Sequence, residues 1–171
     1  MIYTVTLNPS IDFIVRLDHL ELGSVNRMTS DDKFAGGKGI NVSRILQRLD
    51  VDNTATGFIG GFTGRFVEDG LTAEGIITNF VQVSEDTRIN VKIKAGEETE
   101  INGAGPKISD EKLEELKAIL AGLSSEDTVV FAGSAPSSLG NQVYNTLIPI
   151  AKKAGAEVVC DFEGQTLLDS L

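Results

Sequence analysis

Cysteine and histidine are nearly absent from this sequence, and their scarcity excludes two kinds of site. Cys160 is the single cysteine, so no disulfide can form within the chain. His19 is the single histidine, and together with one cysteine it cannot build a zinc site of the His/Cys kind. Cys160 lies in the apolar run 158–160, which is typical of a buried structural thiol rather than of a nucleophile.

Long hydrophobic runs and an excess of positive charge are also missing. No apolar stretch is long enough to cross a bilayer, and the N-terminus lacks the basic flank and cleavage pattern of a signal peptide, so we expect a cytoplasmic protein with no membrane partner. The formal net charge of −10 argues against a nucleic-acid partner, whose phosphates attract basic surfaces. A small phosphorylated ligand needs only two or three local cations and stays compatible with this charge.

Apolar, β-branched runs alternate with segments of helical period along the 171 residues, which are enough for one well-buried core. Strands are expected at 2–7, 54–59, 128–132 and 156–161, and helices at about 42–49, 63–74, 109–123 and 141–154. Pro149 should kink or break the last of these helices. This order predicts an α/β fold, a single domain over 1–171 with a mostly parallel sheet flanked by helices.

Two segments show an alternation of period two and break that rhythm. They lie near 11–34 and 87–103, and we expect them to form a small antiparallel lid that projects from the α/β body. In the second segment Arg88, Asn90, Lys92 and Lys94 must share one face and Ile89, Val91 and Ile93 the other. The polar face can line a cleft while the apolar face packs.

The stretch 36–42, GGKGINV, stands at the start of an expected helix. It matches neither the phosphate-binding loop of nucleotide hydrolases nor the dinucleotide-binding fingerprint. Glycines expose backbone amides, the helix start carries partial positive charge, and Lys38 adds a full one. Asn41 lies on the same first turn. A polyhydroxylated or anionic small molecule is therefore expected here, and the alternative is a loop whose glycines only make a tight turn.

Seven motifs occur in one order along the chain, and together they are specific. They are TLNPSID at 6–12, NR at 26–27, GGKGINVSR at 36–44, GFIGG at 57–61, DTRINVK at 86–92, TEIN at 99–102 and GSAP at 133–136. In this combination the sequence resembles the amino-terminal half of the ribokinase-like, or phosphofructokinase B, sugar kinases, in their phosphosugar branch. The resemblance implies a doubly wound, ribokinase-like sheet with a small antiparallel β lid.

The same resemblance implies a substrate class and a set of binding residues. The implied reaction is the phosphorylation of fructose 1-phosphate by ATP to fructose 1,6-bisphosphate, a step of fructose metabolism and glycolysis. Tagatose 6-phosphate or fructose 6-phosphate as acceptor, or a non-catalytic phosphosugar-binding module, are the alternatives. The implied binding residues are Asp12, Gly36, Gly37 and Asn41 for the sugar, Arg27 and Arg88 for the phosphate, Lys38 and Ser134 nearby, and Asn90 on the same face. Otherwise the two arginines would be surface ion-pair residues, Asp12 a turn residue and Ser134 a cap.

The catalytic half of the family pattern is not found in this sequence. The family's Gly-Ala-Gly-Asp motif, which carries the base, is absent, and no asparagine has a glutamate three residues later, as the magnesium-organising motif requires. We therefore expect no catalytic residue in this chain, truncation of the nucleotide-binding half, and ATP and Mg²⁺ bound only by the full-length enzyme. Asp161 is a candidate for the outer shell of the magnesium, or else a strand-end cap. The resemblance also implies a homodimer through the lid.

Overall fold

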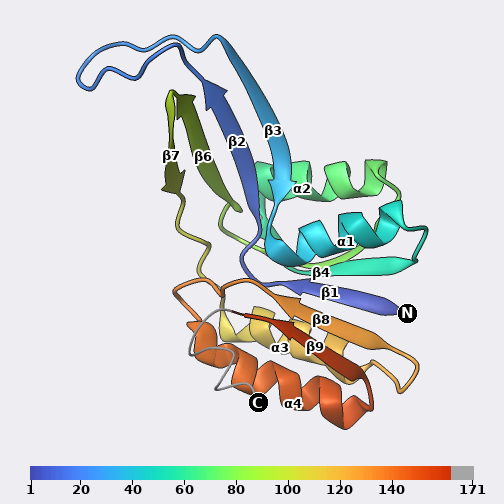
Figure 1. The fold of residues 1–171 in the computed structure, drawn as a ribbon. Helices are drawn as coiled ribbons and strands as arrows, with labels where there is room; N and C mark the ends of the chain where they lie inside the picture. The colour runs from blue at the N-terminus through green and yellow to red at the C-terminus, as the bar shows by residue number, and fades with distance from the viewer. Residues whose placement is uncertain (163–171) are drawn as a thin grey trace.

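A computed structural model describes residues 1–162 of the chain. Its body is a five-stranded sheet with the strand order β5-β4-β1-β8-β9, in which every neighbouring pair is parallel (Figure 1). The strands are β1 Ile2–Thr6, β4 Asn53–Gly60, β5 Ile77–Val83, β8 Thr128–Ala132 and β9 Glu157–Asp161. The mostly parallel α/β sheet expected from the sequence is confirmed.

Helices cover both faces of this sheet. Helices α1 Lys38–Arg48 and α2 Gly61–Ala73 lie on one face, and α3 Asp110–Ala121 and α4 Tyr144–Ala154 lie on the other (Figure 1). Two buried clusters correspond to the two faces: one includes Ile40, Ile59 and Leu71, and the other includes Phe131 and Leu147. The sheet is therefore doubly wound. No helix within residues 1–162 is long and apolar enough to cross a membrane.

Helix α4 contains Pro149 without a break. A short 3₁₀ helix, Asn141–Val143, leads into it, and Pro149 lies on its exposed face. The backbone carbonyl that loses its partner at a proline can be hydrated on such a face, which explains why the expected interruption does not occur.

Strand β5 was not predicted from the sequence. Within residues 1–162 it pairs with β4 alone, at the edge of the body sheet, and its polar residues Thr78, Asn79 and Gln82 interrupt the apolar pattern. Edge strands expose one side, so they need not be uniformly apolar.

The lid is a second sheet of four strands in the order β3-β2-β6-β7. Its strands are β2 Ser10–Arg16, β3 Ser30–Gly36, β6 Arg88–Ala95 and β7 Glu97–Asn102. The hairpins β2/β3 and β6/β7 are antiparallel, as expected of the lid, and the central pair β2/β6 that joins them is parallel, which the sequence did not indicate. Strands β2 and β6 follow β1 and β5 of one parallel sheet, and both therefore leave the body in the same direction (Figure 1).

Candidate functional site

A cavity of about 230 Å³ lies where the lid joins the carboxyl edge of the body sheet. The residues around it come from the end of β1 and the turn after it, from β2 and β6 of the lid, from the start of α1, and from the end of β8. They are Thr6, Asn8, Ser10, Asp12, Gly37, Lys38, Asn41, Arg88, Asn90, Ala132, Gly133 and Ser134. Carboxyl ends of parallel strands are the usual place for ligands in open α/β sheets.

Most of the residues expected at the site are brought together by the fold. Asp12, Gly37, Lys38, Asn41, Arg88, Asn90 and Ser134 all line the cavity. Gly36 lies directly behind Asp12, since a Cβ at this glycine would be 2.6 Å from Asp12 Oδ1. Arg27 is different: it is exposed in the loop between β2 and β3 and is not among the lining residues. The expectation that Arg27 joins Arg88 in one pocket does not hold within the single chain.

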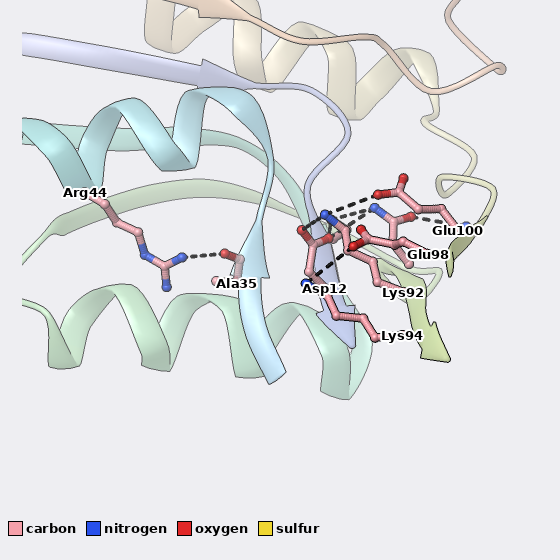
Figure 2. A network of polar contacts seen from close by, with 10 residues as sticks. Asp12, Ala35, Arg44, Lys92, Lys94, Glu98 and Glu100 are labelled. Atoms are coloured by element: carbon pink, nitrogen blue, oxygen red, sulfur yellow. Dashed lines mark hydrogen bonds and ion pairs between the residues drawn. The ribbon is translucent and has the colours of Figure 1, made fainter. Parts of the chain in front are cut away.

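The carboxylate of Asp12 is held from two sides on the polar face of the lid (Figure 2). Its Oδ1 accepts hydrogen bonds from Ser10 Oγ at 2.8 Å and from Asn90 Nδ2 at 3.2 Å. Its Oδ2 faces Lys92 Nζ at 3.6 Å, and Lys92 Nζ lies 3.7 Å from Glu100 on β7. Within residues 1–162, Oδ2 accepts no hydrogen bond from a neutral side chain. It can therefore accept one from a hydroxyl group of a ligand.

Arg88 lies at the junction between the lid and the body. Its Nη2 donates to the backbone carbonyl of Asn8 at 3.0 Å, and its Nη1 lies 3.5 Å from the carbonyl oxygen of Gly103. The side chain is half-buried, and this burial lowers the pKa of the guanidinium from its usual value, while the charge of Asp12 acts in the opposite direction. A partly desolvated cation of this kind attracts an anion more strongly than one in bulk water does.

The glycines at the start of α1 serve two different purposes. Gly37 is the N-cap with φ +128°, a backbone conformation that side chains rarely adopt. Gly36 and Gly39 instead make room for protein side chains, because a Cβ at Gly39 would lie 2.4 Å from Thr6 Oγ1. The interpretation that Gly36, Gly37 and Gly39 all expose backbone amides to a ligand was therefore too broad. The first-turn amides and Lys38 still present positive charge to the cavity.

Several polar atoms around the cavity lack hydrogen-bond partners within residues 1–162. They are Thr6 Oγ1, Asn8 Oδ1 and Arg88 Nε, and each belongs to a residue that lines the cavity. Buried polar groups are normally paired, so hydrogen bonding within the protein is incomplete at this edge of the cavity.

Sequence reasoning missed five of the lining residues as members of the site. They are Thr6, Asn8, Ser10, Ala132 and Gly133. The signal that could have found them was positional: Thr6 and Ala132 end adjacent strands of the parallel sheet, and Asn8 and Ser10 follow immediately. Tyr144 was also not expected to contribute. Its hydroxyl donates a hydrogen bond of 2.9 Å to the backbone carbonyl of Gly133 and so supports this edge of the cavity.

The candidate magnesium residue lies beside the cavity rather than in it. Asp161 is exposed at the end of β9, and it lines a neighbouring groove together with Lys38 and Asn41. No group of three or more His, Cys, Asp or Glu side chains that could hold a metal ion occurs in the described range 1–162. The role of Asp161 in the outer shell of a magnesium ion therefore stays a prediction.

Residues 5–171 match the family model described as pfkB family carbohydrate kinase. The chain belongs to this family. The pfkB assignment agrees with the resemblance seen in the sequence, and it covers nearly the whole chain. Solved structures of similar proteins superpose on nearly the whole chain, so they share this fold.

Three similar proteins illustrate which kinases the chain resembles. The chain is 50% identical to the 1-phosphofructokinase of Bacillus subtilis over 168 residues, which cover 98% of the chain and 55% of that protein. It is 38% identical to a tagatose-6-phosphate kinase of Staphylococcus epidermidis, covering 100% of the chain and 56% of that protein. The crystal structure of Escherichia coli phosphofructokinase-2 in complex with fructose-6-phosphate superposes with a TM-score of 0.90 at 27% identity, over 98% of the chain and 56% of that one. The chain thus spans little more than half the length of these relatives.

Proposed function

We propose that the full-length protein is an ATP-dependent kinase of a ketose phosphate, with fructose 1-phosphate as its acceptor, and that this chain supplies the acceptor site. The observation that carries the proposal is the convergence of Asp12, Arg88 and the start of α1 on one cavity. The 50% identity to a 1-phosphofructokinase supports the choice of acceptor.

The proposed binding mode divides the cavity between hydroxyls and phosphate. Asp12 accepts from sugar hydroxyls, and the amide side chain of Asn41 both accepts and donates, which suits the same groups. Lys38, Arg88 and the first-turn amides of α1 hold the phosphate, and Ser134, which also lines the cavity, adds a hydroxyl. ATP would supply the transferred phosphoryl group, and these residues orient the acceptor toward it.

Kinetics of the full-length protein test this proposal. We expect kcat/KM with fructose 1-phosphate to exceed the values with tagatose 6-phosphate and fructose 6-phosphate, each measured with saturating MgATP. A preference for tagatose 6-phosphate would favour the second candidate function, for which the relative at 38% identity is the supporting observation. Binding of a ketose phosphate without turnover on any of the three would instead favour a non-catalytic phosphosugar-binding module.

We also propose that the 171-residue chain alone has no kinase activity. The sequence contains neither Gly-Ala-Gly-Asp nor Asn-x-x-Glu, the motifs that the family resemblance links to the base and to magnesium. Loss of a general base alone typically lowers the rate by about a hundred- to ten-thousandfold. Conversion of fructose 1-phosphate by the purified chain with MgATP, above a no-protein blank, would contradict this proposal.

A homodimer through the lid is the proposed assembly. Ile89, Val91 and Ile93 share the apolar face of β6, and Ile101 of β7 lies beside Val91 in the strand register. Ile89 and Ile101 are exposed in the single chain. Apolar side chains gathered on one face of a sheet are typical of a surface that another subunit covers.

A further inference from the structure

We propose that Ser10 and Asn90 are positioning residues that orient the Asp12 carboxylate for the acceptor sugar. This inference rests on the proposed function, in which Asp12 accepts hydrogen bonds from sugar hydroxyls. It gives Ser10 a role that neither the motif pattern nor the comparisons assign. It also changes the role expected for Asn90, from a ligand of the substrate to a support for one.

Three side-chain atoms, one each from Ser10, Asp12 and Asn90, are joined pairwise by hydrogen bonds. Ser10 Oγ donates to Asp12 Oδ1 at 2.8 Å, Asn90 Nδ2 donates to the same oxygen at 3.2 Å, and Asn90 Nδ2 also donates to Ser10 Oγ at 3.1 Å. Ser10 and Asn90 are both buried, so the bond between them is protected from water. Two neutral donors on Oδ1 fix the rotation of the carboxylate and leave Oδ2 facing Lys92.

The strand register explains why these three residues meet. Asp12 and Asn90 are direct partners in the parallel pair β2/β6, and Ser10 precedes Asp12 by two positions on the same face. Gly36 forms the wall behind them, because a Cβ there would lie 2.6 Å from Asp12 Oδ1 and 2.7 Å from Ser10 Oγ. The carboxylate therefore has little room to rotate away.

Both polar side-chain atoms of Asn90 have partners within the protein. Its Nδ2 is used by Ser10 and Asp12, and its Oδ1 accepts from the backbone amide of Gly103 at 3.2 Å. Gly103 directly follows the last strand of the lid, β7. The orientation of Asp12 is thus linked through Asn90 to the point where the chain leaves the lid.

A double-mutant cycle in the full-length protein tests the inference. The dissociation constant for fructose 1-phosphate is measured by calorimetry for wild type, Ser10→Ala, Asp12→Ala and the double variant. We expect Ser10→Ala to weaken binding about tenfold, as for loss of a hydrogen bond to a charged group. The double variant should bind as Asp12→Ala does, because Ser10 acts only through Asp12. The dissociation constant for ATP should not change in Ser10→Ala.

Ser43→Ala is the matched control. Ser43 is fully buried and shares a side-chain hydrogen bond of 2.6 Å with Thr4, but it does not line the cavity. It should affect thermal stability and leave the affinity for fructose 1-phosphate unchanged. If Ser10→Ala does not fold, Asn90→Ala replaces it in the same cycle with the same expected outcome.

The possible failures separate the inference from the proposed function. If Asp12→Ala leaves the affinity for fructose 1-phosphate unchanged, the proposed acceptor site is wrong. If Asp12→Ala weakens binding and Ser10→Ala does not, only the positioning role is overturned. An equal effect of Ser10→Ala with and without Asp12 would also overturn it, because Ser10 would then contact the sugar independently.

Discussion

Gly36 illustrates how a single missing Cβ can shape a binding site. The glycine motif indicated its importance, but the physical reason lies in the tertiary structure. The position that a Cβ would occupy is already filled by Asp12 and Ser10, which come from another strand. A sequence pattern cannot reveal such a contact, since it depends on the pairing of β2 with β3.

Substitution of this glycine has an expected cost in both affinity and stability. Gly36→Ala should displace the Asp12 carboxylate, weaken fructose 1-phosphate binding, and lower the free energy of unfolding by about 1–3 kcal/mol, as overpacking does. Chemical denaturation and calorimetric titration measure the two effects.

Gly70→Ala is the control for this substitution. Gly70 lies inside α2, and a Cβ there would meet nothing within 4 Å. It should raise stability by about 0.5–1 kcal/mol, because alanine favours the helix, and it should not alter binding. Equal stability changes at the two glycines would contradict the packing account.

Helix α1 shows what periodicity can and cannot predict. The apolar spacing of Val42, Ile45, Leu46 and Leu49 correctly indicated a helix, but this stripe is not the face packed on the sheet. Ile45 is 53% exposed and Leu49 66%, whereas the buried residues are Gly39, Ile40 and Ser43. Close packing against β1 selects small residues there, so the buried face does not look apolar.

The two isoleucines of α1 allow a matched test of this assignment. Ile40→Ala should destabilise the 171-residue chain by about 2–5 kcal/mol, because its side chain is fully buried. Ile45→Ala should change its stability by less than about 0.5 kcal/mol. Urea unfolding of both variants measures the difference, and a larger effect at Ile45 would show that the wrong face has been assigned to the core.

The body strands other than β5 were predictable because they are short, apolar and β-branched, while the topology of the lid was not. Alternation in 11–17 and 87–94 indicated strands with one polar and one apolar face, and Asp12, Arg88 and Asn90 do share the polar one. Nothing local to either segment specifies that they pair in parallel. That follows from the exits of β1 and β5 on the same edge of the body.

The lid projects from the body of the molecule (Figure 1). This arrangement leads to a prediction about dimer formation. We expect the full-length protein to sediment as a dimer at micromolar concentration, and Ile101→Lys to shift it toward monomer by placing a charge in the apolar contact. Ile77→Lys is the control, because Ile77 is 56% exposed, close to the 57% of Ile101, but lies on the body at β5. Dissociation by both variants alike, or a wild-type monomer, would contradict a lid dimer.

The central claim is that the cavity between lid and body binds a phosphorylated ketose through Asp12. The most direct measurement is a calorimetric titration of fructose 1-phosphate into nucleotide-free full-length protein, repeated with Asp12→Ala and with Asp32→Ala. Asp32 is a lid carboxylate that pairs with Arg16 at 2.6 Å and does not line the cavity. We predict that Asp12→Ala weakens binding by about ten- to a hundredfold and that Asp32→Ala leaves it unchanged. Wild-type affinity in Asp12→Ala would contradict the account.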